Sequence, residues 1–532
     1  MKRILLSLVL ILALLMPGWS CAEAPAGYEA YDEPITITVG KKVNANPSFA
    51  DAADTQENNE MTRIIKDVLN IDVKLAWESD EYDTKLAMSI ISQDLPDVFV
   101  VNDRLVYQQL VENNLLADLS EAYDTYASQY IRDVMESYGN QTLVRDEEGH
   151  LYGIGQGNIY YNNHSMLWLR KDWLDALNLE APTTLEEVEQ VLIAFRDHYG
   201  SKGLLVDGSN PFGGAGAFYS LYQLASAFGA YPDTWVAGED GRAVYGSVMP
   251  GMKDALEVMA RWYAEGLIDP EFAVRGHDEV SALFASGESG AVFAPWSLPY
   301  QITDLMNTEG AELIMCNAPV NADGTFTLLN ALPYSSMLCV SAKCEHPEAA
   351  IKMLSLEFDA YLGYYAEGFE RLSADITNNA SWAALFPTGT VNMAYSYRLL
   401  EYYECIRELL DNQGVFPDPD KYGASMQKNA FDVYNYANGD KSVVNGWIGY
   451  YGRVMTADLF NADNIRLMFP VFDGTTESMS DLWASLESLE LQTFLSIVTG
   501  QKPVEEFDSF VTQWYSQGGD IVTEEVNEAI GK

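Results

Sequence analysis

Residues 150–195 read HLYGIGQGNIYYNNHSMLWLRKDWLDALNLEAPTTLEEVEQVLIAF, and they contain the best-specified local structure in the chain. Ser165 to Leu169 is an apolar run after its first residue and predicts a buried strand, and a helix is expected to begin at Arg170. Thr183 or Thr184 can cap a second helix, because a glutamate follows each of them three residues later. The segment therefore predicts a strand followed by two helices.

Strands and helices also alternate on the N-terminal side of this segment. Ile35 to Val39 and Ile71 to Trp77 alternate like half-buried strands, and Leu95 to Val101 resembles a strand buried on both faces. Met61 to Leu69 and Tyr82 to Ser92 carry apolar residues at helical spacing. This alternation predicts an α/β lobe with a mostly parallel sheet.

Ligands of parallel sheets lie beyond the carboxyl ends of the strands, which here are the loops at Lys41–Ser48, Trp77–Tyr82 and Val101–Leu105. Asn44 and Asn46 in the first loop, and Trp77 in the second, are therefore candidate ligand contacts. Amide groups can hydrogen-bond to a polar ligand, and an indole ring can pack against its apolar face.

The C-terminal side of the chain remains a mixture of helical and extended patterns. Helices are expected at Phe218–Phe228 and Met252–Tyr263, after Pro347, and at Val522–Ile530. Extended segments are expected from Leu313 through a hairpin-like turn at Asn321–Gly324 and again over Ser336–Ser341.

The N-terminus predicts export. Lys2 and Arg3 precede an apolar run from Ile4 to Met16, which is too short to span a membrane and matches a signal peptide. Two endings remain open: cleavage after Ala24, within Ala-Glu-Ala, or lipidation of Cys21, whose preceding residues are a poor match to a lipidation signal. No later segment is apolar for long enough to span a membrane.

Composition limits the class of partner. The chain has 532 residues, a formal net charge of −47 and 48% hydrophobic residues, so it can build large cores and is expected to repel nucleic acid and anionic lipid. Its cysteines form no C-x-x-C pair. We expect Cys316, Cys339, Cys344 and Cys405 to be buried free thiols, although Cys339 and Cys344 could pair outside the cell.

The sequence has little catalytic or metal-binding signal. It contains no H-E-x-x-H, P-loop, G-x-S-x-G or Rossmann glycine motif, and we expect no cofactor and no metal. The histidines are dispersed and are expected to be surface or loop residues: His150, His164, His198, His277 and His346. The informative excess is aromatic, with 32 Tyr, 21 Phe and 11 Trp, because sugar C–H faces pack on aromatic rings.

The order of motifs resembles the family 1 extracellular solute-binding proteins of bacterial ABC importers. The resemblance rests on the Arg-Lys-Asp-Trp-Leu helix start at Arg170, the Pro-Thr-Thr start at Pro182, Leu283–Gly287, Gly290–Trp296 and Lys343–Ala350. It implies a two-lobed α/β, periplasmic-binding-protein-like fold of type II with several interdomain crossings. Where many relatives resemble a calcium loop, this chain has only Asp207-Gly208-Ser209-Asn210, so no calcium site is expected.

The resemblance also implies lobe boundaries and ligand contacts. We expect a signal peptide over 1–24, an N-terminal lobe from 25–160 and 315–370, and a C-terminal lobe from 161–314 and 371–532. In sugar-binding relatives an aromatic residue just past the Gly290 strand stacks on a sugar, which makes Trp296 the main candidate. The other candidates lie at the two crossings: Tyr160, Tyr161, Asn163 and Tyr334.

The resulting hypothesis is an extracellular, cell-surface or periplasmic protein, expected to be monomeric. It would capture a sugar or oligosaccharide between its lobes and deliver it to the membrane subunits of an ABC permease, without catalysis. Two alternatives remain open. A secreted carbohydrate-active enzyme shares the export signal and the aromatic residues, and a peptide- or lipid-handling receptor shares the fold.

Overall fold

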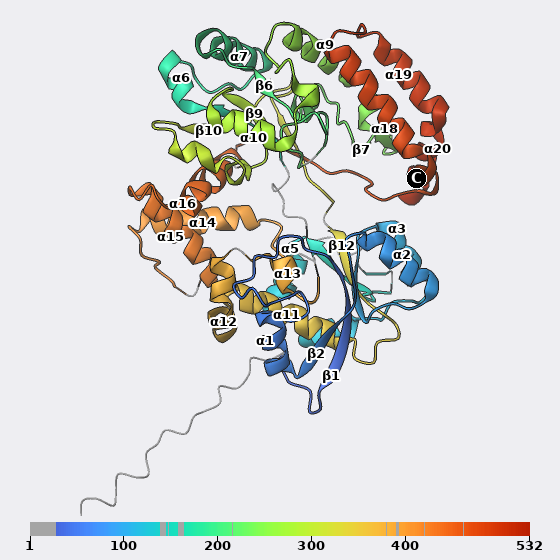
Figure 1. Ribbon diagram of the computed structural model, residues 1–532. Helices are drawn as coiled ribbons and strands as arrows, with labels where there is room; N and C mark the ends of the chain where they lie inside the picture. The colour runs from blue at the N-terminus through green and yellow to red at the C-terminus, as the bar shows by residue number, and fades with distance from the viewer. Residues whose placement is uncertain are drawn as a thin grey trace, which may run out of the picture.

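Two β-sheets, each with its own apolar core, divide the protein into two lobes (Figure 1). The predicted signal peptide and Cys21, together with Tyr160, Tyr161 and Asn163, lie outside the described residues. The computed structural model describes residues 28–138, 145–146, 148–157, 164–214, 216–332, 334–378, 380–389, 393–419, 421–460 and 462–532.

The first lobe contains a five-stranded sheet in the order β2-β1-β3-β12-β4. β1 is parallel to β2 and β3, whereas β12 is antiparallel to β3 and β4. The carboxyl ends of β1, β2, β3 and β4 therefore share one edge with the start of β12, and the chain leaves for the second lobe from this edge. The strands are β1 (Ile35–Lys42), β2 (Ile71–Ser79), β3 (Val98–Val101), β4 (Gly153–Gly157) and β12 (Tyr334–Val340).

Helices pack on both faces of this sheet, and α11 is buried along nearly its whole length. Side chains from Leu372 to Met393 also pack into the first core, beyond the residue at which the sequence predicts a return to the second lobe. The helices are α1 (Glu60–Leu69), α2 (Tyr82–Ser92), α3 (Arg104–Glu112), α4 (Ser120–Tyr126), α5 (Gln129–Ser137), α11 (Glu348–Leu362), α12 (Ala366–Thr377) and α13 (Trp382–Leu385).

The second lobe contains a four-stranded sheet in the order β10-β5-β9-β6. Because β5 is antiparallel to β9 and β10, Met166 pairs with Ala294 and Leu167 pairs with Cys316. These residues form the edge of the second sheet from which the crossing segments leave. The strands are β5 (Met166–Arg170), β6 (Leu204–Leu205), β9 (Ala291–Ala294) and β10 (Leu313–Cys316).

Alternate residues of this sheet enter two different cores, because successive side chains of a strand point to opposite faces. Leu167, Leu169 and Phe293 pack with one set of helices, and Trp168 and Val292 pack with the other. The remaining helices of the lobe are α6 (Lys171–Leu177), α7 (Leu185–Tyr199), α8 (Tyr222–Ser226), α9 (Gly251–Ala264), α10 (His277–Ser286), α18 (Glu477–Val498), α19 (Glu506–Trp514) and α20 (Asp520–Ala529).

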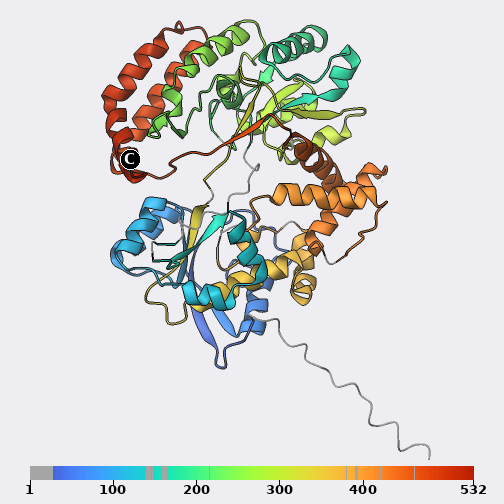
Figure 2. The same cartoon turned by 180° about the vertical axis from the view of Figure 1, so that it is seen from behind.

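Residues 398–460, which we call the helical insert, connect the two lobes and lie beside them in both views (Figures 1 and 2). After the insert, β13 (Ile465–Met468) pairs in parallel with β11 (Phe326–Leu329), and a hairpin of β7 (Trp235–Ala237) and β8 (Ala243–Tyr245) lies in the second lobe. The insert consists of α14 (Arg398–Asp411), α15 (Ala424–Ala437), α16 (Val444–Gly449), a π-helical turn η6 (Tyr450–Val454) and α17 (Met455–Phe460).

Local sequence explains the helix starts that were expected. The Thr184 hydroxyl accepts a hydrogen bond from the Glu187 N–H at 3.2 Å, and the Glu187 carboxylate accepts one from the Thr184 N–H at 3.1 Å, which confirms the expected cap of α7. The helix expected over 218–228 is shorter. Its helical part is Tyr222–Ser226, because Tyr219 adopts a positive φ of 57° and Ser220 bonds back to the Gly213 carbonyl.

The hairpin-like turn forms at Asn321–Gly324, where the Asn321 N–H donates to the Thr325 carbonyl at 2.7 Å. The strands beside it do not pair with each other. β10 joins the second sheet, and β11 pairs with β13, which lies more than a hundred residues further along the chain. Within the described residues no helix is both long and apolar enough to span a bilayer.

Candidate functional site

The crossing edges of the two sheets bring several sequence-predicted residues to the junction of the lobes. In the first lobe this edge carries the loops after β1, β2 and β3. In the second lobe it carries Ala294, and Trp296 follows two residues later. The helical insert flanks this junction (Figures 1 and 2), so the candidate site is built from three parts of the chain.

The loop after β1 is held by its own polar contacts. Asn44 Nδ2 donates to Ser381 Oγ at 2.8 Å, and Asn44 Oδ1 accepts from the Asn46 N–H at 3.1 Å. Asn46 is exposed. Asn44 therefore fixes the loop against the segment before α13, which leaves the Asn46 side chain free to face solvent.

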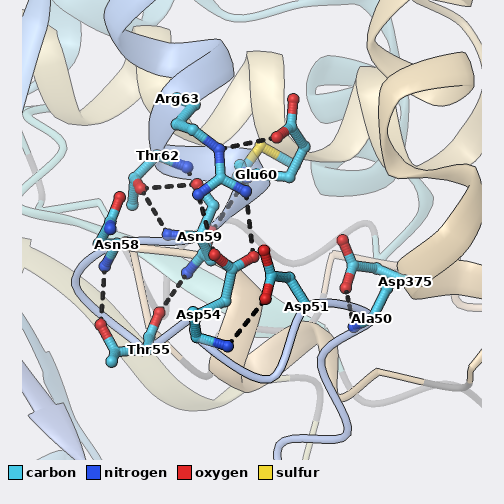
Figure 3. A network of polar contacts seen from close by, with 12 residues as sticks. Ala50, Asp51, Asp54, Thr55, Asn58, Asn59, Glu60, Thr62, Arg63 and Asp375 are labelled. Atoms are coloured by element: carbon cyan, nitrogen blue, oxygen red, sulfur yellow. Dashed lines mark hydrogen bonds and ion pairs between the residues drawn. The ribbon is translucent and has the colours of Figure 1, made fainter.

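The same loop is anchored further on by a polar network (Figure 3). Arg63 on α1 forms a bidentate ion pair with Asp54 at 2.9 and 3.0 Å, and Asn59 caps α1 through the Met61 and Thr62 N–H groups. The Ala50 N–H donates to Asp375 on α12 at 2.7 Å. These contacts hold the segment after β1 against α1 and α12.

Trp77 packs into the first lobe. Its ring lies over Gly40, where an added Cβ would come within 2.6 Å of the indole, and it contacts Tyr82 with ring centroids 5.1 Å apart. Its Nε1 is buried without a hydrogen-bond acceptor among the described residues. The backbone of Tyr334 begins β12, and its side chain lies outside the described residues.

Trp296 lies directly beyond β9 and is half-buried. Its indole contacts Tyr300, whose side chain is 44% exposed, at a centroid distance of 6.2 Å in an edge-to-face arrangement. The Arg453 guanidinium lies over the Trp296 ring, 5.4 Å from its centroid. Trp296, the predicted sugar-stacking residue, is therefore in contact with Arg453, a cation of the helical insert.

Arg453 also stacks on a second aromatic ring. Its guanidinium lies 4.7 Å from the Tyr402 centroid, and its Nη2 donates to Tyr300 Oη at 3.0 Å. It is presented by the π-helical turn η6, where Gly452 approaches Trp296 so closely that an added Cβ would lie 2.7 Å from the Trp296 carbonyl oxygen. Such π-helical turns are frequently found at functional sites.

Tyr402 extends the stack toward the first lobe. The Arg398 guanidinium lies 4.9 Å from the Tyr402 centroid and pairs with Glu401 at 2.9 Å. Tyr364, which is 47% exposed, lies beside Arg398, and the equally exposed Tyr397 stacks on Tyr395. We call Trp296, Arg453, Tyr402 and Arg398 the aromatic–arginine stack; it can offer ring faces and N–H donors to a polar ligand.

A cavity of about 660 Å³ lies beside the crossing segments, next to the other core of the second lobe. Segments 329–332 and 470–475 line it, and the Thr475 N–H donates to Asp103 of the first lobe at 3.1 Å. Its aromatic walls include half-buried Trp483 and buried Trp235. Its polar groups include Asn210, Asp233, Asp473, Ser480, Thr475 and Glu487.

Carboxylates dominate the electrostatics of this cavity. Asp233 has a positive φ of 57°, and loss of water together with repulsion from Glu487 raises its pKa to about 6. Glu490, which lines an adjoining cavity of about 470 Å³, accepts a hydrogen bond from Ser247 at 2.7 Å. Its burial raises its pKa to about 8.

His164 lies in a loop, as expected for the histidines, but it is buried and only 2% exposed. It lies just before β5, at the described end of the first crossing, and contacts Phe460 edge-to-face at 5.8 Å. Burial lowers its pKa to about 3, and interactions with the Leu329 backbone and the Asn330 side chain offset only part of that shift.

Among the described residues, no group of three or more His, Cys, Asp or Glu side chains is placed to bind a metal ion. At the position where many relatives resemble a calcium loop, Asp207 Oδ1 accepts from the Ser209 N–H at 2.9 Å and from the Ser209 hydroxyl at 2.7 Å. The described cysteines are free, and Cys316, Cys339 and Cys405 are buried as expected, whereas Cys344 is only partly buried.

The sequence did not indicate Arg453, Tyr402 or Arg398. They belong to a Tyr-rich helical region with no recognisable motif, and they meet Trp296 only through the tertiary fold. The one available signal was the density of aromatic residues after Phe358.

Residues 52–356 match the family described as bacterial extracellular solute-binding protein. The polygalacturonan/rhamnogalacturonan-binding protein YtcQ of Bacillus subtilis is 23% identical over 301 residues, which are 56% of this chain and 58% of that protein. The fructooligosaccharide-binding protein FusA of Streptococcus pneumoniae is 24% identical over 245 residues, 41% of this chain and 45% of that protein. The chain thus matches about half the length of these curated relatives.

The fold is that of solved solute-binding proteins. An HMO-binding, ABC-transporter-associated solute-binding protein from Bifidobacterium longum infantis superposes with a TM-score of 0.59 and 15% identity, covering 94% of this chain and 99% of that chain. This similarity confirms the two-lobed α/β fold expected from the sequence.

Proposed function

Because the chain belongs to the bacterial extracellular solute-binding protein family, we propose that it captures a saccharide between its two lobes and delivers it to an ABC importer. The relatives named above bind oligo- and polysaccharides, which supports a saccharide as the ligand class. The predicted export signal and the family description support a location outside the cytoplasm. If Cys21 is lipidated, the protein would be anchored to the membrane through that residue.

The observation that carries the proposal is the aromatic–arginine stack. Trp296 follows the crossing edge of the second sheet, and Tyr402, Arg453 and Arg398 come from the insert. Tyr364, which precedes α12 of the first lobe, lies beside Arg398. Sugar faces pack on aromatic rings, and sugar hydroxyls accept hydrogen bonds from guanidinium N–H groups. A ligand held there would contact groups from both lobes and the insert.

Such placement supports a closure mechanism without a covalent step. A ligand that touches both lobes in the closed state, but only one in the open state, shifts the population toward closure by its extra contacts. Hinge closure around a ligand is the usual motion of binding proteins of this shape. The importer would then recognise the closed form.

The test is a thermal-shift screen of residues 25–532 with neutral and acidic oligosaccharides, amino sugars and short peptides. A ligand at 100 times its Kd should raise the free energy of unfolding by about 2.7 kcal/mol. The ligand should be recovered unchanged. Breakdown of a glycan would favour the enzyme alternative. A thermal shift with a peptide, and with none of the sugars, would refute the saccharide as the ligand class.

Two matched tryptophan variants locate the site. Trp296→Ala should lower saccharide affinity several-fold or more, because the variant lacks the ring on which a sugar face would pack. Trp483→Ala removes an equally half-buried indole from the 660 Å³ cavity and should leave affinity unchanged. The opposite pattern would move the saccharide site from the aromatic–arginine stack to that cavity.

A further inference from the structure

Arg453 has an unusual environment for an arginine in an acid-rich protein. The chain has 78 acidic and 31 basic residues, so carboxylate partners are abundant. Arg398, the other guanidinium on Tyr402, pairs with Glu401 at 2.9 Å. Within the described part of the chain, however, no Asp or Glu oxygen lies within ion-pair distance of Arg453.

The hydrogen-bonding capacity of Arg453 is also unfilled. A guanidinium has five N–H donors. Nη2 donates to Tyr300 Oη at 3.0 Å and Nη1 reaches Asn429 Oδ1 at 3.5 Å, while Nε is buried without an acceptor among the described residues. Both protein acceptors are uncharged, so the positive charge of Arg453 is not neutralised within the site.

The guanidinium is nevertheless held in a defined orientation. It lies 5.4 Å from the Trp296 centroid and 4.7 Å from the Tyr402 centroid, and the π-helical turn η6 sets its backbone. Cation–π contact and a fixed backbone reduce the entropy that would be lost when a ligand binds. An oriented, uncompensated guanidinium is the group that best recognises a planar anion through two parallel N–H···O bonds.

We propose that Arg453 binds the carboxylate of an acidic saccharide whose ring packs on Trp296, so that the ligand class is a uronate-containing oligosaccharide. This inference rests on the proposed function, because it assigns the chemistry of the same site. Because Tyr300 Oη accepts a hydrogen bond from Arg453, its own O–H group remains available to donate to a sugar oxygen. The screening length at 0.15 M salt is about 8 Å, so carboxylates further than this from Arg453 repel a bound anion only weakly.

The experiment compares each acid with its own neutral form. Oligomers of galacturonate, glucuronate and mannuronate, and their methyl esters, are titrated calorimetrically into residues 25–532 at 0.15 M salt. Methyl esterification removes the charge and keeps the sugar ring. The wild-type protein should bind at least one acid tenfold or more tightly than its ester.

Variants then assign the preference to Arg453. Arg453→Gln should bring the acid-to-ester ratio to about one by weakening the acid much more than the ester, and Arg453→Lys should retain part of the preference, because a point charge lacks the planar fork. Arg407→Gln is the control: Arg407 lies on α14, is half-exposed and pairs with Asp411 at 3.7 Å. Circular dichroism of each variant verifies folding.

The outcomes separate this inference from the function on which it rests. Equal binding of acid and ester, binding of neutral sugars alone, or a preference that survives Arg453→Gln would overturn the carboxylate assignment and leave saccharide binding intact. If no saccharide of the panel bound measurably, the proposed function would be overturned, and the carboxylate assignment with it. An altered ratio in Arg407→Gln would show that the preference comes from general surface charge.

Discussion

The buried His164 predicts a loss of stability in mild acid. A histidine has a pKa of about 6.5 in an unfolded chain, and burial lowers it to about 3 in the folded protein. As the pH falls below 6.5, His164 therefore binds a proton in the unfolded state but not in the folded state. The stabilising contribution is complete above pH 6.5 and is lost as the pH falls from 6.5 toward 3.

The magnitude follows from this linkage. Each pH unit below 6.5 lowers the free energy of unfolding by about 1.4 kcal/mol. Between pH 7 and pH 5 the loss through His164 alone is about 2 kcal/mol. His164→Gln keeps a polar side chain and removes the titration, so the variant should lack this part of the pH dependence.

The assay is urea denaturation at pH 7, 6 and 5, with the difference between wild type and His164→Gln as the measured quantity. The difference is needed because Glu490 and Asp233, whose pKa values are raised, titrate with the opposite sign over this range. His198→Gln, which removes an exposed histidine from α7, is the control. Parallel pH profiles for wild type and His164→Gln would refute the reasoning.

Three further substitutions test other parts of the structure. Glu490→Gln should stabilise the protein increasingly from pH 5 to pH 7 in the same assay, because a folded pKa of about 8 makes ionisation of the native Glu490 unfavourable; a constant offset would contradict this. Thr184→Ala should lower the free energy of unfolding by about 1 kcal/mol through loss of the α7 cap, and an unchanged denaturation midpoint would count against that role. Gly452→Ala should weaken saccharide binding several-fold, because its Cβ would push η6 away from Trp296. Gly276→Ala, which meets nothing within 4 Å, should bind normally.

Local patterns predicted the elements that local interactions stabilise. The strand expected over Ser165–Leu169 is β5 (Met166–Arg170), and the cap at Thr184 begins α7. Both depend on residues close in sequence, an apolar run in one case and a reciprocal side-chain to backbone bond in the other. The α/β fold class followed from the same kind of evidence.

Long-range pairings could not be predicted in this way. β11 pairs with β13 across the whole helical insert, and no feature of either strand specifies the other. Arg453 likewise becomes a candidate ligand contact only because η6 places it over Trp296 and Tyr402. Such residues have no motif, since their role depends on distances between parts of the chain that are remote in sequence.

The high pKa values of the described cysteines have a practical consequence for observing lobe closure. Thiolates, not thiols, react with maleimide dyes, and burial raises the pKa of Cys316, Cys344 and Cys405 to about 12 and raises that of Cys339 further. The native thiols should therefore stay unlabelled near pH 7. Met88→Cys on α2 and Val274→Cys in the second lobe, at positions 61% and 82% exposed, would then accept a fluorophore pair in an otherwise unaltered chain. Energy transfer between the two dyes would report closure directly, one molecule at a time.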